Sequence, residues 1–193
     1  PRVAAAPRPR LSTQQHMLNI VADHFVLSDI NGDGYLDIVS SHSWYIEITY
    51  NLNISGTGLE FEEHTIYAPI VGAYTFPFTV ADLDSDGDDD IIYTTTIAQE
   101  LIWAENVYSE GDEFITHTIF ELSYFPNEYA TGDFDNDGDM DIITSTLEDK
   151  VCWIENLGGE FFSFESIIEE IENMKCMTFT DLQGDNDLDL LIG

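Results

Sequence analysis

Basic side chains are scarce in this chain. Among its 193 residues, 5 Lys and Arg stand against 38 Asp and Glu, which gives a formal net charge of −33. Such a surface repels phosphate backbones and anionic lipids, so the sequence argues against nucleic acid and anionic membranes as partners. It attracts multivalent cations instead. Long apolar runs are also absent because Asp, Asn or Gly interrupts them, and we expect no membrane-spanning helix and no direct membrane insertion.

Cysteine is equally rare. Cys152 and Cys176 both lie in apolar, strand-like runs. They can form a disulfide in an oxidising compartment or remain as small buried thiols, and the sequence leaves both alternatives open. Three of the five basic residues fall in the N-terminal PRVAAAPRPR. We expect residues 1–14 to be a linker, a propeptide remnant or the mature end left after signal removal.

What the chain has in quantity is residues that favour strands. Hydrophobic residues make up 44% of the chain, enough for a core, and the aromatic share of 12% consists mostly of Phe and Tyr. Ile and Thr are also common, and these residue types favour strands over helices. The composition therefore predicts an all-β protein.

An acidic segment of ten residues occurs four times. The copies are DINGDGYLDI from Asp29, DLDSDGDDDI from Asp82, DFDNDGDMDI from Asp133 and DLQGDNDLDL from Asp181. The first three fit D-x-D/N-x-D-G-x-x-D, and each copy follows one short apolar run and precedes another. Their spacing of roughly 50 residues is in the range of a propeller blade.

Further features repeat in the same phase. Tyr50, Trp103 and Trp153 occur in ITYNLN, LIWAEN and VCWIEN, each of which ends in an Asn that is typical of turns. Alternating segments follow at FEEHTIYA, FITHTIFE and FFSFESII. Each unit is therefore predicted to run strand, acidic loop, strand, strand, turn, strand, which makes a four-stranded antiparallel sheet.

The predicted fold is thus a β-propeller with about three and a half blades in this chain. The blades are expected at residues 23–68, 74–122, 126–170 and 174–193, within a repeat region of 15–193. The segment QQHMLNI, which contains His16, resembles a last strand that closes a ring by completing the final blade. A third strand of the fourth unit would still be missing, so we expect these residues to be part of a larger propeller.

The acidic segments have the chemistry of calcium loops. Aspartates at positions 1, 3 and 5 of a tight loop turn their oxygens toward one point, and Gly at position 6 allows a sharp turn with positive φ. Position 7 offers its backbone carbonyl, and the Asp at position 9 closes the shell. Hard oxygen ligands suit Ca²⁺, whereas Zn²⁺ favours His or Cys. Strands follow each loop, so the pattern is not an EF-hand.

We predict three to four Ca²⁺ sites. The ligands in the first three loops are Asp29, Asn31, Asp33, the Tyr35 carbonyl and Asp37; Asp82, Asp84, Asp86, the Asp88 carbonyl and Asp90; and Asp133, Asp135, Asp137, the Asp139 carbonyl and Asp141. The fourth loop offers Asp181, Gln183, Asp185, Asp187 and Asp189, but Gln183 replaces an acid and Asn186 replaces the glycine. The alternative of merely solvated acidic turns is weakened by four copies in register.

These loops, the WAEN and WIEN strands and the roughly 50-residue spacing closely resemble the FG-GAP and VCBS repeat family, over nearly everything from His16 to Gly193. The resemblance implies a β-propeller, commonly seven-bladed, with Ca²⁺ in the loops between the first two strands of each blade. Such propellers occur in integrin α subunits, in lectins and in extracellular modules attached to enzymes or adhesins.

We therefore expect a secreted or cell-surface calcium-binding module for adhesion or recognition, with a glycan or an extracellular protein as its partner. A non-catalytic propeller attached to a polysaccharide-degrading enzyme and a structural subunit of an extracellular filament or sheath are the alternatives. No G-x-S-x-G, H-E-x-x-H or Cys-His constellation occurs, so we expect no enzyme. The triplet NIS predicts N-glycosylation at Asn53.

Some repeated side chains are expected to pack rather than to bind. His64 and His117 lie one repeat apart in HTI triplets, and Trp103 and Trp153 share one position of the repeat. We interpret all four as packing residues. Trp44 breaks the register, so it is the aromatic residue most expected to be exposed for a ligand.

Overall fold

The protein is described by a computed structural model. The residues that the structure describes are 22–42, 47–56, 60–66, 77–95, 99–107, 113–123, 126–146, 150–168, 177–185 and 188–193. The predictions for residues 1–14, His16, Trp44 and Cys176 lie outside these ranges. All regular structure within them is strand, as predicted. The described residues contain no helix with the length and apolar character needed to cross a membrane.

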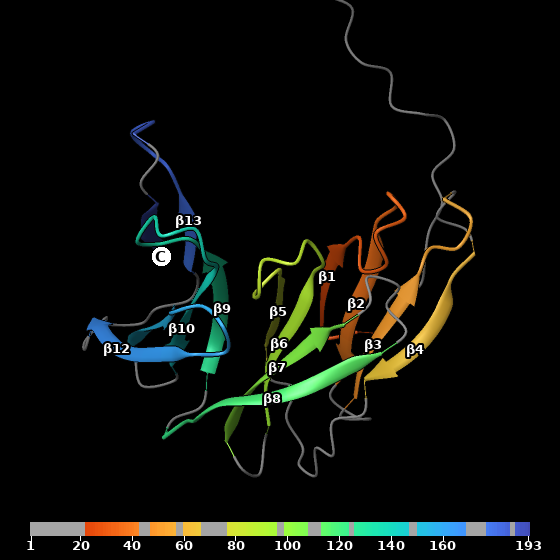
Figure 1. The fold of residues 1–193 in the computed structure, drawn as a ribbon, viewed down its shortest axis with the longest axis horizontal. Coiled ribbons are helices and arrows are strands. Elements are labelled where there is room, and N and C mark those ends of the chain that lie inside the picture. The colour runs from red at the N-terminus through yellow and green to blue at the C-terminus, as the bar shows by residue number, and fades with distance from the viewer. Residues whose placement is uncertain are drawn as a thin grey trace, which may run out of the picture.

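Three consecutive four-stranded antiparallel sheets and one two-stranded sheet form the fold (Figure 1). Unit 1 contains β1 (His24–Ser28), β2 (Asp37–His42), β3 (Glu47–Leu52) and β4 (Glu62–Ile66). Unit 2 contains β5 (Phe78–Ala81), β6 (Asp90–Thr94), β7 (Glu100–Asn106) and β8 (Phe114–Glu121). Unit 3 contains β9 (Pro126–Gly132), β10 (Asp141–Thr146), β11 (Val151–Asn156) and β12 (Phe162–Ile168). Unit 4 contains β13 (Met177–Thr180) and β14 (Asp189–Ile192).

Strand order within each of the three complete sheets follows the chain, as the repeat pattern predicts. The acidic segments join the first strand of each unit to the second, and the register at this junction is the same in all four units. The last residue of the first strand pairs with the ninth residue of the acidic segment: Ser28 with Asp37, Ala81 with Asp90, Gly132 with Asp141 and Thr180 with Asp189.

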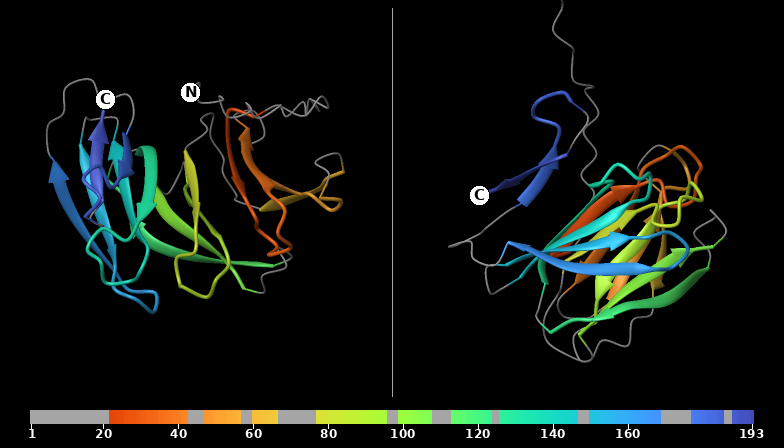
Figure 2. Two further views of the ribbon diagram at one scale, coloured as in Figure 1. Left: turned by 90° about the horizontal axis from the view of Figure 1, so that it is seen from above. Right: turned by 60° about the vertical axis from the view of Figure 1, so that its left-hand side comes forward.

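The units stand side by side in an arc, with their first strands next to one another (Figures 1 and 2). Strand β1 contacts β5, β5 contacts β9, and β9 contacts β13. Units 2 and 3 thus each present one face of the sheet to the preceding unit and the other face to the next. Units arranged in this way bury their apolar side chains between sheets.

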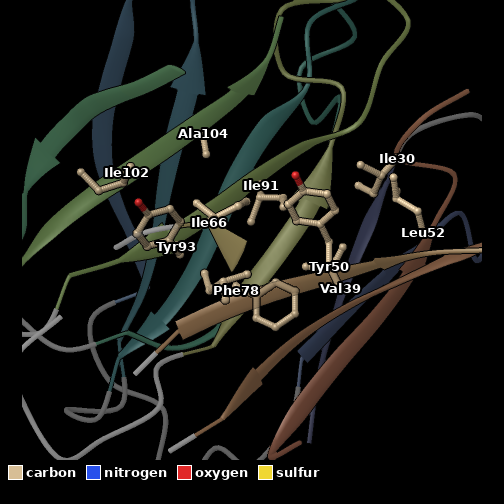
Figure 3. Close-up of a cluster of buried hydrophobic side chains, with 11 residues drawn as sticks. Ile30, Val39, Tyr50, Leu52, Ile66, Phe78, Ile91, Tyr93, Ile102 and Ala104 are labelled. Carbon is tan, nitrogen blue, oxygen red and sulfur yellow. The ribbon is translucent and has the colours of Figure 1, made fainter. Parts of the chain in front are cut away.

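The hydrophobic core is accordingly divided among the interfaces. Between units 1 and 2, buried Val39 and Tyr50 lie in one cluster with Phe78 and Ile91 (Figure 3). A second cluster, between units 2 and 3, contains Ile92, Trp103, Tyr129 and Ile142. The third joins Ile143 and Val151 to Met177 of unit 4, and Trp153 packs against it. Trp103 and Trp153 therefore pack at interfaces between units, as predicted.

In units 1 and 3, the last residue of the first strand contacts the acidic loop of the next unit. The Ser28 hydroxyl at the end of β1 donates to the Asp89 carboxylate in the loop of unit 2. At the same position in unit 3, a methyl group on Gly132 would lie only 2.8 Å from the Leu188 side chain of unit 4. A polar pair at one interface thus corresponds to a glycine and leucine contact at another.

The same repeat position is occupied by Phe in units 1 and 2, but among the described sheets a neighbour covers it only in unit 2. Phe25 in β1 and Phe78 in β5 are equivalent by register. Phe78, which packs on unit 1, is 2% exposed, whereas Phe25 is 59% exposed. Residue type is the same, so the difference comes from the neighbouring sheet.

We expect Phe78→Ala to lower the free energy of unfolding by about 3–5 kcal/mol, because it opens a cavity between units 1 and 2. In the same 193-residue chain, the matched variant Phe25→Ala should change it by less than about 1 kcal/mol. Urea denaturation followed by circular dichroism measures both. Equal losses in the two variants would contradict the assignment of Phe78 to an interface.

Candidate metal centres

The first three acidic loops are held by hydrogen bonds from their own backbone. In the second loop, the Asp82 carboxylate accepts the N–H groups of Asp86 at 3.1 Å and Gly87 at 3.0 Å. The Asp86 carboxylate in turn accepts the Asp88 N–H at 3.0 Å. The equivalent bonds occur in the first and third loops. Short loops of this kind hold the carboxylates at positions 1 and 5 in fixed directions.

Left-handed backbone conformations make these turns. The predicted glycines at position 6 have positive φ: Gly34 at +88°, Gly87 at +101° and Gly138 at +104°. No atom lies within 4 Å of the place that a Cβ would take at these three residues, so the conformation and not the space requires glycine. Position 4 is also left-handed, with Ser85 at +62° and Asn136 at +63°. A left-handed conformation at position 4 was not predicted.

Carboxylates converge in two of the loops. Oxygen atoms of Asp82, Asp84 and Asp86 lie within 4.8 Å of one another, and those of Asp133, Asp135 and Asp137 do the same. The first loop has Asn31 at the third position, whose amide donates to Asp33 at 3.3 Å. The atoms that these side chains can offer to a metal are hard oxygens, which are the ligands that Ca²⁺, Mg²⁺ and Mn²⁺ prefer. These residues therefore fit a hard divalent cation.

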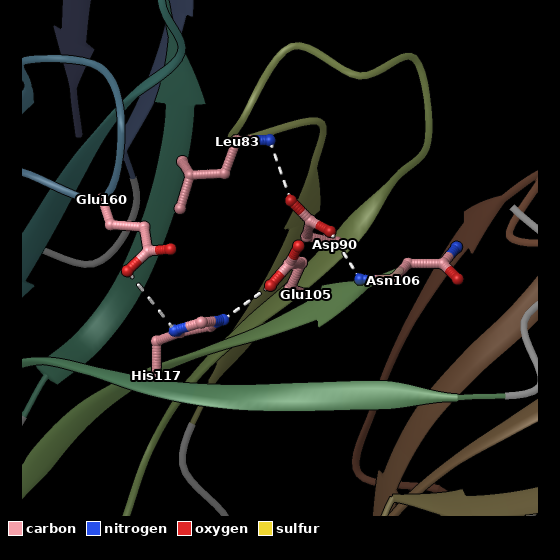
Figure 4. Close-up of polar contacts among 6 residues, drawn as sticks. All are labelled: Leu83, Asp90, Glu105, Asn106, His117 and Glu160. Carbon is pink, nitrogen blue, oxygen red and sulfur yellow. Dashed lines mark hydrogen bonds and ion pairs between the residues drawn. The ribbon is translucent and has the colours of Figure 1, made fainter. Parts of the chain in front are cut away.

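The ninth-position aspartates of the first three loops are buried and use both oxygens to hold the backbone. Asp90 accepts the Leu83 N–H at 3.0 Å and the Asn106 N–H at 2.8 Å (Figure 4). Asp37 accepts from Ile30 and Asn53, and Asp141 accepts from Phe134 and Asn156. Each of these carboxylates thus joins its loop to the end of the third strand. A carboxylate oxygen has two lone pairs, so an oxygen that accepts one hydrogen bond can also bind a cation. That these three aspartates are cation ligands stays a prediction.

Burial perturbs the protonation of these carboxyl groups. It raises the pKa of Asp90 from 3.8 to about 7, although the N–H groups of Asn106 and Leu83 act in the opposite direction. Burial also raises the pKa of Asp37 and Asp141. For Asp84, burial raises the pKa and the neighbouring Asp86 carboxylate adds to the effect. A proton or a cation therefore stabilises these groups where they stand.

The fourth loop differs from the other three. The Asp181 carboxylate accepts the N–H groups of Gln183, Gly184 and Asp185. The Gln183 amide donates to Asp189 at 3.4 Å, so it presents a donor toward a predicted ligand. Among the described residues of this loop, no three carboxylates converge as in the second and third loops. Asn186 and Asp187 lie outside the described ranges, and cation binding here stays a prediction.

The Asn at the end of the third strand in units 2 and 3 donates to the preceding unit. The Asn106 side-chain amide donates to the Ile30 carbonyl at 2.7 Å, and that of Asn156 donates to the Leu83 carbonyl at 2.7 Å. Both carbonyls belong to the second residue of an acidic loop. From sequence, these asparagines were expected only to form turns. The same position in successive repeats indicates a common role for these asparagines, but it does not identify their hydrogen-bond partners.

Asn53 is the unit 1 member of the same set. It is buried, its N–H donates to Asp37 at 2.7 Å, and its side-chain nitrogen donates to the Leu36 carbonyl at 3.4 Å. An N-linked glycan is attached to this same nitrogen. The burial therefore argues against the predicted glycosylation in the folded chain, and the position of Asn53 in the repeat accounts for its presence.

The two repeated histidines stack on the aromatic residues of the third strands. His117 lies against Trp103 with ring centroids 4.6 Å apart, and His64 lies against Tyr50 at 4.9 Å. His117 also contacts Glu105 at 2.6 Å and Glu160 of unit 3 at 3.9 Å (Figure 4). These contacts agree with the prediction that the histidines pack within the repeat.

The raised pKa of Asp90 predicts a pH dependence in the presence of a chelator. The folded state holds the Asp90 proton more tightly than the unfolded state, so the resulting stability is complete below pH 3.8 and is lost as the pH rises through about 7. Asp90→Asn should make the fall in the free energy of unfolding between pH 5 and about pH 8 less steep. Chemical denaturation over this range measures the slope.

A control for this prediction removes one charge elsewhere. Glu63 is exposed on β4, so Glu63→Gln should keep the slope of the unchanged protein. If Asp90→Asn and Glu63→Gln gave the same slope, general charge repulsion and not the buried carboxyl group would explain the pH dependence.

Comparison with known proteins identifies the repeat. The model of the FG-GAP-like repeat matches residues 29–93 and 133–192, two segments that contain all four acidic loops. A search among curated proteins found no match. The matched segments begin at Asp29 and Asp133, the first residues of the first and third loops. They cover more than half of the chain, and the protein therefore belongs to the FG-GAP-like repeat family.

Proposed function

We propose that this protein is an extracellular β-propeller module in which Ca²⁺ orders the acidic loops and which binds a glycan or an extracellular protein. One observation carries the proposal: three aspartates converge within 4.8 Å in each of two loops that have the same backbone hydrogen bonds. Repeats of this family are typical of extracellular proteins and often bind Ca²⁺. The module binds a partner and does not catalyse a reaction.

Calcium fits the loops better than other hard cations. Carboxylates at positions 1, 3 and 5, a carbonyl at position 7 and a further carboxylate at position 9 give an irregular set of oxygens, which Ca²⁺ accepts. Mg²⁺ requires nearly octahedral geometry and keeps several of its waters. The loops are largely exposed, and such sites suit the high concentration of Ca²⁺ outside cells. The second and third loops are the strongest candidates, and the first and fourth bring the number to three or four.

The arc of units supports a propeller. At the far end of unit 4, Leu182 is 62% exposed, whereas the equivalent Ile30 of unit 1 is fully buried by unit 2. At the near end, Phe25 is uncovered where Phe78 is covered. Both ends thus keep side chains that other units bury. We propose that further units of the same kind cover these two faces in a closed ring.

We place the proposed recognition surface beside the acidic loops, where apolar side chains are exposed. The turn after β11 lies next to the third loop, because a methyl group on Gly158 would be 3.1 Å from an Asp139 oxygen. In this turn Leu157 is exposed and Phe161 is 71% exposed. Ile54 is exposed in the corresponding turn of unit 1. Exposed apolar side chains beside ordered loops are typical of binding surfaces.

A chelator should lower the melting temperature markedly, and Ca²⁺ should restore it more completely than Mg²⁺. At a free concentration of about 100 times the Kd, one occupied site adds about 2.7 kcal/mol to the free energy of unfolding. Asp84→Asn and Asp135→Asn should each reduce the gain from Ca²⁺, whereas Glu63→Gln on β4 should not. Differential scanning calorimetry measures these gains. A melting temperature that does not respond to chelator or Ca²⁺ would overturn the proposal.

A glycan array with and without Ca²⁺ tests the partner. We expect binding that chelator reduces and that Phe161→Ser also reduces, because Phe161 lies on the proposed surface. Ile115→Ser changes another exposed residue, on the outer strand β8, and should leave binding unchanged. Absence of any glycan signal would favour a protein partner. Binding that neither chelator nor Phe161→Ser affects would contradict the proposed surface.

A further inference from the structure

The asparagines at the ends of β7 and β11 bond to two units at once. Asn106 and Asn156 are both almost fully buried. Their N–H groups donate to the ninth-position aspartate of their own loop, Asp90 at 2.8 Å and Asp141 at 2.7 Å. Their side-chain amides donate to the loop of the preceding unit. Each asparagine therefore touches two successive acidic loops.

These bonds form one continuous chain. The Ile30 carbonyl of the first loop accepts from Asn106, and the N–H of Asn106 donates to Asp90. Asp90 accepts the Leu83 N–H at 3.0 Å. The carbonyl of the same Leu83 accepts from Asn156 at 2.7 Å.

The chain continues into the third loop. Asn156 donates its N–H to Asp141, which accepts the Phe134 N–H at 3.2 Å. Leu83 is the link in the second loop, because its N–H and its carbonyl are both used. The sequence separations are large: Asn106 is 76 positions from Ile30, and Asn156 is 73 positions from Leu83. Bonds of this kind cannot come from local turn formation.

Burial makes the bonds interdependent. A buried amide or carbonyl that loses its partner is not compensated by water, so breaking one bond is unfavourable unless the surrounding structure opens as well. If Leu83 of the second loop moves away from Asp90, its carbonyl also moves away from Asn156. Disorder in one loop therefore destabilises the asparagine that holds the next loop.

We infer that Asn106 and Asn156 are positioning residues that couple neighbouring acidic loops, so that order imposed on one loop is transmitted to the loop of the adjacent unit. The part of this inference that concerns cations rests on the proposed function, since the cation would impose the order. Without cations, the same coupling acts on the stability of the loops. The competing explanation is that each asparagine stabilises only the end of its own strand.

Hydrogen exchange of the full chain, followed by mass spectrometry of peptides that cover the three loops, separates the two explanations. In chelator, Asn156→Ala should speed exchange about five- to tenfold in the second loop as well as in the third, and leave the first within about twofold. Asn106→Ala should move the effect to the first and second loops. Asn127→Ala, an exposed asparagine of β9, is the control and should change none.

Other outcomes would overturn the coupling. If Asn156→Ala changed only the third loop, the asparagine would act locally. If it changed all three loops equally, it would lower global stability without coupling particular neighbours. Should Asn156→Ala fail to fold, Asn156→Ser keeps a polar side chain but is too short to reach the Leu83 carbonyl, and the same pattern is expected for it.

Addition of Ca²⁺ distinguishes this inference from the proposed function. Wild-type loops that gain no protection from Ca²⁺ would overturn calcium binding, and the measurements in chelator would then decide the coupling alone. If Ca²⁺ protects the wild-type loops, Asn156→Ala should lose part of the gain in the second loop, although no predicted ligand has been changed. A full gain in that loop would overturn the coupling.

Discussion

Repulsion among clustered carboxylates is the constraint on which this fold depends. The chain concentrates its negative charge where the first strand of each unit turns into the second, and the oxygens of three aspartates meet within 4.8 Å in two of these turns. Backbone N–H groups point at the carboxylates and partly offset the repulsion. A cation held by these carboxylates, as we propose, would offset the remaining repulsion and so stabilise the folded loop.

The same loops connect the units. The ninth-position carboxylate bonds to the third strand of its own sheet, and the asparagine at that strand end bonds to the loop before it. Apolar packing follows the same direction, because each cluster draws its members from two successive units. A single sheet would leave both of its apolar faces in water. The units therefore stabilise one another through both polar and apolar contacts, as expected of repeat architectures.

Much of this architecture can be predicted from the sequence, because repetition reveals phase. Four copies of the acidic segment located the loops, and the alternating segments between them located strands that the structure confirms. The glycines at position 6 were predicted to have positive φ, and they do.

Contacts between units could not be predicted in the same way. Phase shows that Asn106 and Asn156 are equivalent, but it does not show that their amides reach a carbonyl more than 70 residues earlier. The buried bonds of Asp90 were hidden for a related reason, since an acidic motif suggests exposure. Only the packing of one sheet on the next determines these partners. The left-handed Ser85 was missed because serine has no strong preference for that conformation.

The contacts at the end of each first strand bear on how the chain avoids misfolding. Units with the same backbone can exchange places during folding, either within one molecule or between two. Unit 3 placed against unit 1 would set Met140 beside the Ser28 hydroxyl, which pairs with Asp89 in the correct order. Unit 2 placed against unit 3 would bring the Asp89 carboxylate to Gly132, where Leu188 belongs. Small differences at one repeated position thus penalise incorrect assemblies that the shared backbone would otherwise permit.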